Sequence, residues 1–144
     1  MSESGTNQIA VNTAGFLLSN MYEHPGMMID MPFSRDIKLI NAWIAGTQYR
    51  ENFVERTSKI EPGYEVKLIR EADNPYDDKA ILVLNKENES IGYVPRRCNE
   101  VIASLMDAGK LIYGRVTEIN RIKTENEETG ISRVFMYMDI FMKD

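Results

Sequence analysis

The strongest constraint on the fold is a two-residue alternation within residues 132–142. The apolar set is Val134, Met136, Met138, Ile140 and Met142. The intervening set is Phe135, Tyr137, Asp139 and Phe141. Because successive side chains of a strand point to opposite faces of a sheet, this pattern predicts a long strand with one buried face. Such a strand needs partners, and the rest of the chain must supply them.

Five further segments have strand character, and turn residues separate them. They cover residues 37–50, 64–70, 80–84, 91–94 and 111–120. One segment has helical periodicity, with apolar residues Cys98, Val101, Ile102, Leu105 and Met106. This spacing predicts an amphipathic helix that ends at Gly109. The sequence therefore predicts a mostly β domain, a curled antiparallel sheet or barrel of six strands with one or two packed helices.

The charge distribution limits which partners the domain can bind. The net charge is −5, yet residues 46–123 hold 13 Lys and Arg residues and 13 Asp and Glu residues. A neutral centre between acidic flanks predicts modest, site-directed affinity for nucleic acid, because broad electrostatic binding needs an excess of cations.

The N-terminal segment, residues 1–36, has weak periodicity and is expected to be a partly disordered arm on a domain formed by residues 37–144. Its methionines, Met27, Met28 and Met31, suit either a cap on the core or a soft contact surface for a protein partner. The chain has one cysteine and no apolar run of membrane-spanning length, and its N-terminus lacks the features of a signal peptide. We therefore expect a cytoplasmic protein without a membrane partner.

The residue inventory argues against catalysis. One histidine and one cysteine cannot build the usual zinc sites, and the chain has no GxxxxGK[ST] loop for nucleotide hydrolysis. Asp73, Asp77 and Asp78 lie in one turn without a second acidic cluster, so they make a weak magnesium site. The expectation is a protein that is not an enzyme and has no cofactor.

A polar loop between the second and third predicted strands has the residue types of a binding site. Asn74 and Pro75 form a turn signal, Tyr76 offers a flat aromatic face, and Asp77 accepts hydrogen bonds. A loop between two packed strands is held rigidly, as a recognition site requires. The same residues also suit an ordinary surface turn, with Tyr76 folded back on the barrel and Asp77 capping the backbone.

The order of several short motifs resembles the HIRAN domain family. The motifs are Arg70-Glu71, Asn74-Pro75-Tyr76-Asp77, Ala80-Ile81, Ile91-Gly92-Tyr93-Val94-Pro95-Arg96, and a helix that ends at Gly109. The similarity runs from about Ile44 to Asn120. The resemblance implies an OB-like barrel of six strands. It also implies a free-standing bacterial member of a family whose eukaryotic members are fused to fork-remodelling helicases. The family's best-understood members bind the 3′ end of single-stranded DNA.

The resemblance also implies roles for particular residues. Tyr76 would stack on a terminal base, and Asp77 would accept the terminal hydroxyl. Asn74 would shape the loop or bond the end nucleotide, and Tyr49 would be a second aromatic contact. Arg96 or Arg97, before the helix, would pair with a backbone phosphate. Gln48 stands where helicase-fused members have an arginine, which removes one phosphate contact. The late aromatic of the pocket is Phe135 or Tyr137.

Two functions follow from these observations. The first is a module that binds single-stranded DNA, at 3′ ends, in DNA repair or fork processing. The second is a protein-interaction module in which the N-terminal arm and the exposed face of the last strand bind a partner. The acidic net charge and Gln48 favour the second, and the Asn74-Pro75-Tyr76-Asp77 loop favours the first. A histidine at position 24, the cysteine at 98 and Tyr93 are expected to have no part in either site.

Overall fold

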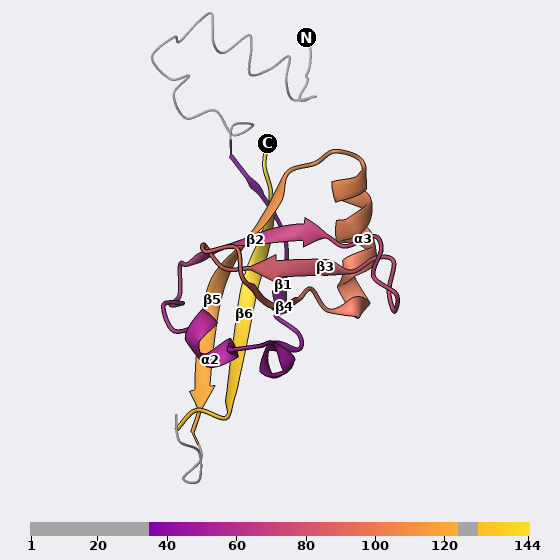
Figure 1. Ribbon diagram of the computed structural model, residues 1–144. Helices are drawn as coiled ribbons and strands as arrows, with labels where there is room; N and C mark the ends of the chain where they lie inside the picture. Colours follow the sequence, from indigo (N-terminus) through magenta and orange to yellow (C-terminus); the bar gives the residue numbers. More distant parts are fainter. Residues whose placement is uncertain (1–34, 124–129) are drawn as a thin grey trace, which may run out of the picture. The chain divides into compact units, whose positions relative to one another are not determined.

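The computed structural model describes residues 35–123 and 130–144, and six antiparallel strands dominate this part of the chain (Figure 1). The strands are β1 (Ile37–Trp43), β2 (Glu65–Arg70), β3 (Ile81–Leu84), β4 (Ser90–Tyr93), β5 (Ile112–Ile122) and β6 (Arg133–Met142). The helices are a 3₁₀ turn η3 (Thr47–Tyr49), a short α2 (Phe53–Arg56) and α3 (Arg96–Asp107). The predicted N-terminal arm lies outside the described residues, except for its last two positions.

The six strands form one sheet in the order β1-β6-β5-β2-β3-β4, and every pair is antiparallel. In Figure 1, β2 and β3 run across the long β5–β6 hairpin. An isolated bridge between Ala45 and Tyr93 joins the segment after β1 to β4, so the two ends of the sheet meet. We call this junction the seam. The predicted mostly β, six-stranded, OB-like fold is confirmed.

Gly92 is required at the seam because the two chains approach closely there. A Cβ atom at Gly92 would lie 2.6 Å from Cγ2 of Ile44 and 2.7 Å from the carbonyl oxygen of Ala45. Two backbone hydrogen bonds join the chains, from Ala45 N to Tyr93 O at 2.8 Å and from Tyr93 N to Ala45 O at 2.9 Å. The absence of a side chain at Gly92 thus allows the barrel to close.

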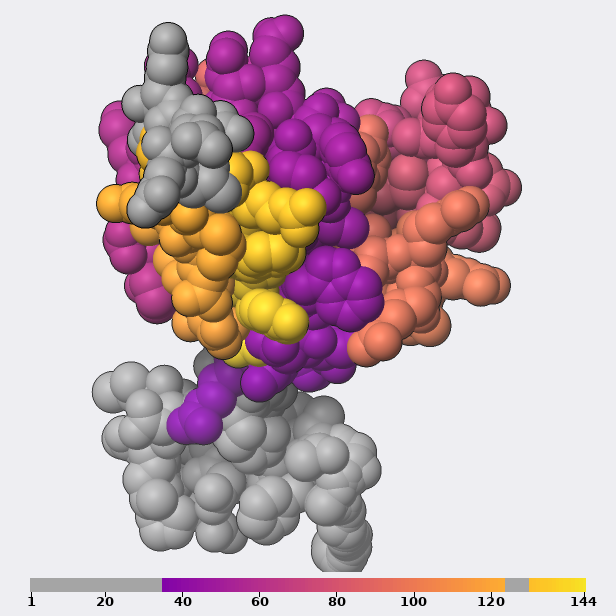
Figure 2. All heavy atoms as spheres, turned by 90° about the horizontal axis from the view of Figure 1, so that it is seen from below, coloured from indigo at the N-terminus to yellow at the C-terminus, as the bar shows by residue number. Residues whose placement is uncertain are grey.

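The core lies inside the barrel, and the inward-facing side chains of β6 fill much of it. Val134, Met136, Met138 and Ile140 are buried, whereas Phe135 and Tyr137 of the opposite face are 46% and 41% exposed. Figure 2 shows β6 in yellow between β5 in orange and β1 in indigo. The predicted division of β6 into two faces is confirmed.

Helix α3 begins after Pro95 and ends as the sequence predicts, and Cys98, Ile102 and Met106 of the predicted stripe face the core. Gly109 has φ 92°, and the amides of Gly109 and Lys110 donate to the carbonyls of Met106 and Leu105, which is a Schellman motif. The fully buried helical residues are Asn99, Ile102 and Ala103. The prediction that Val101 faces the core was wrong, since Val101 is 67% exposed.

The predicted first strand is too long at its C-terminal end. It was expected to continue to residue 50, but β1 ends at Trp43 and residues 47–49 form the 3₁₀ turn η3. Gly46 has φ 75°, a left-handed conformation that ends an extended strand. Gly46 therefore directs the following residues away from the sheet. Within the described residues, no helix is long and apolar enough to cross a membrane.

Candidate functional site

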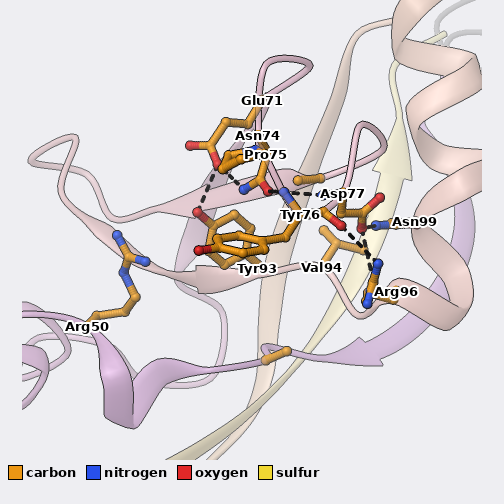
Figure 3. Close-up of a pocket in the computed structure, with 12 residues that line it drawn as sticks. Arg50, Glu71, Asn74, Pro75, Tyr76, Asp77, Tyr93, Val94, Arg96 and Asn99 are labelled. Atoms are coloured by element: carbon orange, nitrogen blue, oxygen red, sulfur yellow. Dashed lines mark hydrogen bonds and ion pairs between the residues drawn. The ribbon is translucent and has the colours of Figure 1, made fainter.

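A cavity of about 600 Å³ lies at the seam, where the polar loop after β2 meets the start of α3 (Figure 3). Its lining residues are Ala45, Arg50, Glu71, Asn74, Pro75, Tyr76, Asp77, Ala80, Tyr93, Val94, Arg96 and Asn99. We call this cavity the seam pocket. Its volume is in the range of pockets that bind small ligands. Four of the six predicted site residues line it: Asn74, Tyr76, Asp77 and Arg96.

Asn74 holds the loop in shape through its side-chain amide. Its Oδ1 atom accepts hydrogen bonds from the backbone amides of Tyr76 at 2.8 Å and Asp77 at 3.1 Å, which forms an Asx turn. Its Nδ2 atom donates to Oε1 of Glu71 at 2.7 Å. The loop conformation is therefore fixed by its own side chains.

Asp77 joins this loop to helix α3. Its Oδ1 atom accepts the backbone amide of Lys79 at 2.9 Å, and its Oδ2 atom accepts Nδ2 of Asn99 at 2.9 Å. Nε of Arg96 forms an ion pair with Oδ2 at 3.4 Å. The Lys79 amide, the Asn99 amide and then the Arg96 charge hold the pKa of the Asp77 carboxyl below its ordinary value. The carboxylate is thus ionised at neutral pH. It also caps the turn, as the alternative interpretation held.

Tyr76 is held away from the barrel rather than folded back on it. The residue is 87% exposed, while its backbone is fixed at the amide by Asn74 and at the carbonyl by Nη2 of Arg96 at 3.1 Å. The loop presents the Tyr76 ring to solvent at the edge of the seam pocket.

Tyr93 was expected only to pack, but it forms one wall of the seam pocket. Its hydroxyl donates to Oε1 of Glu71 at 2.9 Å. Burial and the neighbouring Glu71 raise the pKa of the Tyr93 hydroxyl. The guanidinium carbon of Arg50 lies 5.5 Å from the centre of the Tyr93 ring, in cation–π contact. Arg50, Glu71 and Tyr93 therefore extend the site beyond the predicted loop.

Tyr49 and Arg97 do not line the seam pocket. Tyr49 is 83% exposed on η3, next to Arg50. Arg97 lies over the ring of Trp43, with 4.7 Å between its guanidinium carbon and the ring centre. The two adjacent arginines of α3 therefore contact different parts of the protein: Arg96 contacts the loop after β2, and Arg97 contacts the end of β1.

Sequence reasoning missed Arg50, Glu71 and Asn99. The sequence did contain a signal for Asn99. It precedes Ile102 and Ala103 by three and four residues, so this polar side chain lies on the same helical face as they do. Glu71 was named in the motif but given no role. No local pattern marks Arg50.

A second cavity of about 520 Å³ lies on the outer face of β1, β6 and β5. Its lining residues are Trp43, Ile44, Glu118, Asn120, Ile122, Phe135, Met136 and Tyr137. We call this surface the aromatic face. Phe135 and Tyr137, the two candidates for the late aromatic of the site, lie here and not in the seam pocket.

The seam pocket combines an exposed aromatic ring, two carboxylates and two arginines. In residues 35–123 and 130–144, no group of three or more His, Cys, Asp or Glu side chains could hold a metal ion. Such a pocket suits a ligand with a flat ring, a hydroxyl and an anionic group.

Comparisons with known proteins give a family and several similar structures. A family model described as the HIRAN domain matches residues 37–136. A crystal structure of a protein from Lactobacillus plantarum is 27% identical, with a TM-score of 0.61 over 75% of this chain and 95% of that chain. A crystal structure of the HIRAN domain of human HLTF is 21% identical, with a TM-score of 0.50 over 73% and 76% of the two chains. An NMR structure of the same HLTF domain in its DNA-bound conformation is 19% identical, with a TM-score of 0.46 over 78% and 84%. A comparison with curated proteins returned no match.

Proposed function

Because this chain belongs to the HIRAN domain family, whose model matches residues 37–136, we propose that it is a DNA-binding module without catalytic activity. Its ligand is single-stranded DNA, and the seam pocket receives the free 3′ end. In this proposal the module acts in DNA repair or fork processing in the cytoplasm of a bacterium. The family supports DNA as the ligand, and the geometry of the pocket supports recognition of an end.

The observation that carries this proposal is the exposed ring of Tyr76 on a loop that its neighbours hold rigid. The ring is 87% exposed, while both the amide and the carbonyl of Tyr76 are hydrogen-bonded. Every base has a flat face, so an aromatic ring presented in this way binds single strands with little dependence on sequence. Stacking on such a ring is worth about 1–3 kcal/mol per base.

Asp77 supports selection of a hydroxyl end. Its carboxylate is ionised at neutral pH and lies in the same pocket as Tyr76. An ionised carboxylate accepts a hydrogen bond from a free hydroxyl and repels a terminal phosphate. Its Oδ2 atom accepts Asn99 and is paired with Arg96, whereas its Oδ1 atom accepts only the Lys79 amide and retains acceptor capacity for a ligand.

The remaining predicted residues have supporting roles in this proposal. Asn74 shapes the loop, as its hydrogen bonds to the Tyr76 and Asp77 amides support. Arg96 fixes the Tyr76 carbonyl and the Asp77 carboxylate. Tyr49 and Arg97, which lie outside the pocket lining, contact nucleotides that precede the end.

Fluorescence anisotropy with labelled single strands at low salt tests this proposal. The strands carry a 3′-hydroxyl, a 3′-phosphate, or a blocked 3′ end with a free 5′ end. We expect tightest binding to the 3′-hydroxyl, weaker binding by Tyr76→Ala, and a smaller preference for hydroxyl over phosphate in Asp77→Asn. Asp77→Asn is preferred to Asp77→Ala because asparagine still accepts the Lys79 amide, and a flipped Asn99 amide offers it an oxygen.

Two results would contradict the proposal. One is no binding of any strand at low salt. The other is binding that is indifferent to the chemistry of the end and to both substitutions. The urea midpoint of each variant serves as a control, since a loss of folding would also reduce binding.

The aromatic face supports a second candidate function, a protein-interaction module. Ile122, Phe135 and Tyr137 are each more than 40% exposed, and they surround the cavity of about 520 Å³. Clustered exposed apolar side chains are typical of partner-binding surfaces. If this function is correct, Phe135→Ser abolishes capture of a partner from a lysate and leaves strand binding unchanged. The proposed role of the N-terminal arm in such binding concerns residues outside the described part.

A further inference from the structure

The four charged side chains of the seam pocket are not equivalent. Arg96 forms an ion pair with Asp77 at 3.4 Å and also donates to the Tyr76 carbonyl. Its positive charge is therefore offset by a carboxylate that it contacts. Glu71 accepts hydrogen bonds from the Tyr93 hydroxyl and the Asn74 amide, and both donors are neutral.

Arg50 is the cation of the pocket that has no carboxylate partner. Within residues 35–123 and 130–144, no carboxylate forms an ion pair with it. Among the described residues, its Nε atom is shielded from solvent and has no hydrogen-bond acceptor. A shielded donor on a charged group is costly to leave unpaired, so such a group calls for an explanation. An anion that binds in the pocket would supply the missing acceptor.

The position of Arg50 also separates it from the carboxylate of Asp77. In Figure 3, Arg50 lies on one side of Tyr93, and the Asp77–Arg96 pair lies on the other. The guanidinium rests on the Tyr93 ring at 5.5 Å from the ring centre, which orients it. An anion beside Arg50 is thus kept apart from the charge of Asp77.

We infer that Arg50 binds a backbone phosphodiester of the strand whose 3′ end occupies the seam pocket. This inference rests on the proposed function and assigns the phosphate contact nearest the 3′ end to Arg50 in place of Arg96 or Arg97. A planar guanidinium suits a phosphate because it donates two parallel hydrogen bonds. Arg50 directly follows Tyr49, so it places a cation beside an exposed aromatic ring.

The groups of a 3′-terminal nucleotide are placed as this arrangement requires. Its free 3′-hydroxyl and its 5′-phosphate lie on opposite sides of the sugar. A terminal nucleotide with its hydroxyl at Asp77 can therefore direct its phosphate toward Arg50. Repulsion from Asp77 and attraction to Arg50 favour the same orientation of the strand.

The salt dependence of strand binding tests this inference. We would measure the affinity of a short 3′-hydroxyl strand at several salt concentrations for the wild type and for Arg50→Gln, Arg96→Gln and Arg50→Lys. Each phosphate contact contributes roughly 0.7 to the slope of log affinity against log salt for single strands. We expect Arg50→Gln to lower the slope by about 0.7 and to weaken binding roughly 10-fold at low salt. Arg50→Lys should keep the slope, and Arg96→Gln should change it less than Arg50→Gln does.

A neutral methylphosphonate in place of the last phosphodiester gives a second readout. It should weaken binding by the wild type and have no further effect on Arg50→Gln, since the two changes remove the same contact. Arg115→Gln is the matched control, because it removes one arginine charge outside the seam pocket. Circular dichroism and the urea midpoint of each variant establish that it is folded.

The outcomes separate this inference from the proposed function. Suppose that the wild type binds strands, and that Arg50→Gln has the same salt slope and the same sensitivity to methylphosphonate as the wild type. This result would overturn the role of Arg50 and leave the proposed function standing. A wild type that binds no strand at low salt would overturn the proposed function and this inference with it. If the salt slope falls more in Arg96→Gln than in Arg50→Gln, the inference is wrong and Arg96 makes the phosphate contact.

Discussion

Replacement of Gly92 by alanine should open the seam, and the structure gives the size of the effect. The new Cβ atom would lie 2.7 Å from the carbonyl oxygen of Ala45, which accepts the Tyr93 amide at 2.9 Å. An ordinary contact requires Ala45 to retreat by about 0.7 Å, which stretches this hydrogen bond beyond its useful range. The paired bond from Ala45 N to Tyr93 O would be distorted with it.

Besides the backbone strain of an alanine at φ 153°, the expected loss of stability has two contributions. Each backbone hydrogen bond contributes about 1 kcal/mol, and forcing an extra carbon against Ile44 and Ala45 costs about 1–3 kcal/mol. The free energy of unfolding should therefore fall by about 3–5 kcal/mol, a large part of the 5–15 kcal/mol typical of a domain. In urea unfolding followed by circular dichroism, the midpoint should decrease by about 2 M.

Two other glycines provide controls for this experiment. Gly63 has φ 99° and nothing within 4 Å of its added Cβ, so Gly63→Ala measures the backbone strain alone. At Gly114 the added Cβ would meet the side chains of Val66 at 2.8 Å and Met138 at 3.0 Å, so Gly114→Ala measures crowding by side chains. If Gly92→Ala costs no more than Gly63→Ala, the seam does not depend on close approach of the two chains and our reasoning is wrong.

Three further predictions concern single side chains. Tyr76→Ala should weaken strand binding by about 1–3 kcal/mol in anisotropy and leave the urea midpoint unchanged, because the ring is 87% exposed. Asp77 has a lowered pKa in the folded state, so its contribution to stability is present at neutral pH and is lost as the pH falls through that pKa. The difference in free energy of unfolding between wild type and Asp77→Asn should therefore stay constant from about pH 8 to 5 and shrink only in stronger acid. Asn85→Ala should lower the free energy of unfolding by about 2–4 kcal/mol in urea, because the buried Asn85 amide accepts the Glu87 and Glu89 amides and donates to the Arg56 carbonyl.

The strands were predictable where one face of the sheet is buried. The alternation in β6 identified Val134, Met136, Met138 and Ile140 as core, and all four are buried. Burial of one face imposes a two-residue period on any sequence that forms such a strand. The loop after β2 was predictable for a similar reason, since asparagine before proline has few conformations available to it.

Other features depend on contacts that no local pattern contains. The helical stripe through Val101 was a reasonable expectation from apolar spacing, but small Ala103 and polar Asn99 face the barrel instead. Asn99 is buried because it donates to Asp77, which lies 22 residues earlier. Tyr93 and Arg50 join the pocket because the seam brings β4 beside the segment after β1. Such long-range contacts become visible only once the sheet has closed.

The hydrogen bonds that fix the loop of Asn74, Tyr76 and Asp77 have a consequence for the kinetics of binding. Its conformational entropy is lost when the chain folds, since the loop is bonded to itself and to α3 in the unliganded protein. A ligand that reaches this loop meets a surface that needs no rearrangement before contact. The association rate constant should then be limited by diffusion and orientation, and differences in affinity among ligands should arise mainly from how fast each one dissociates.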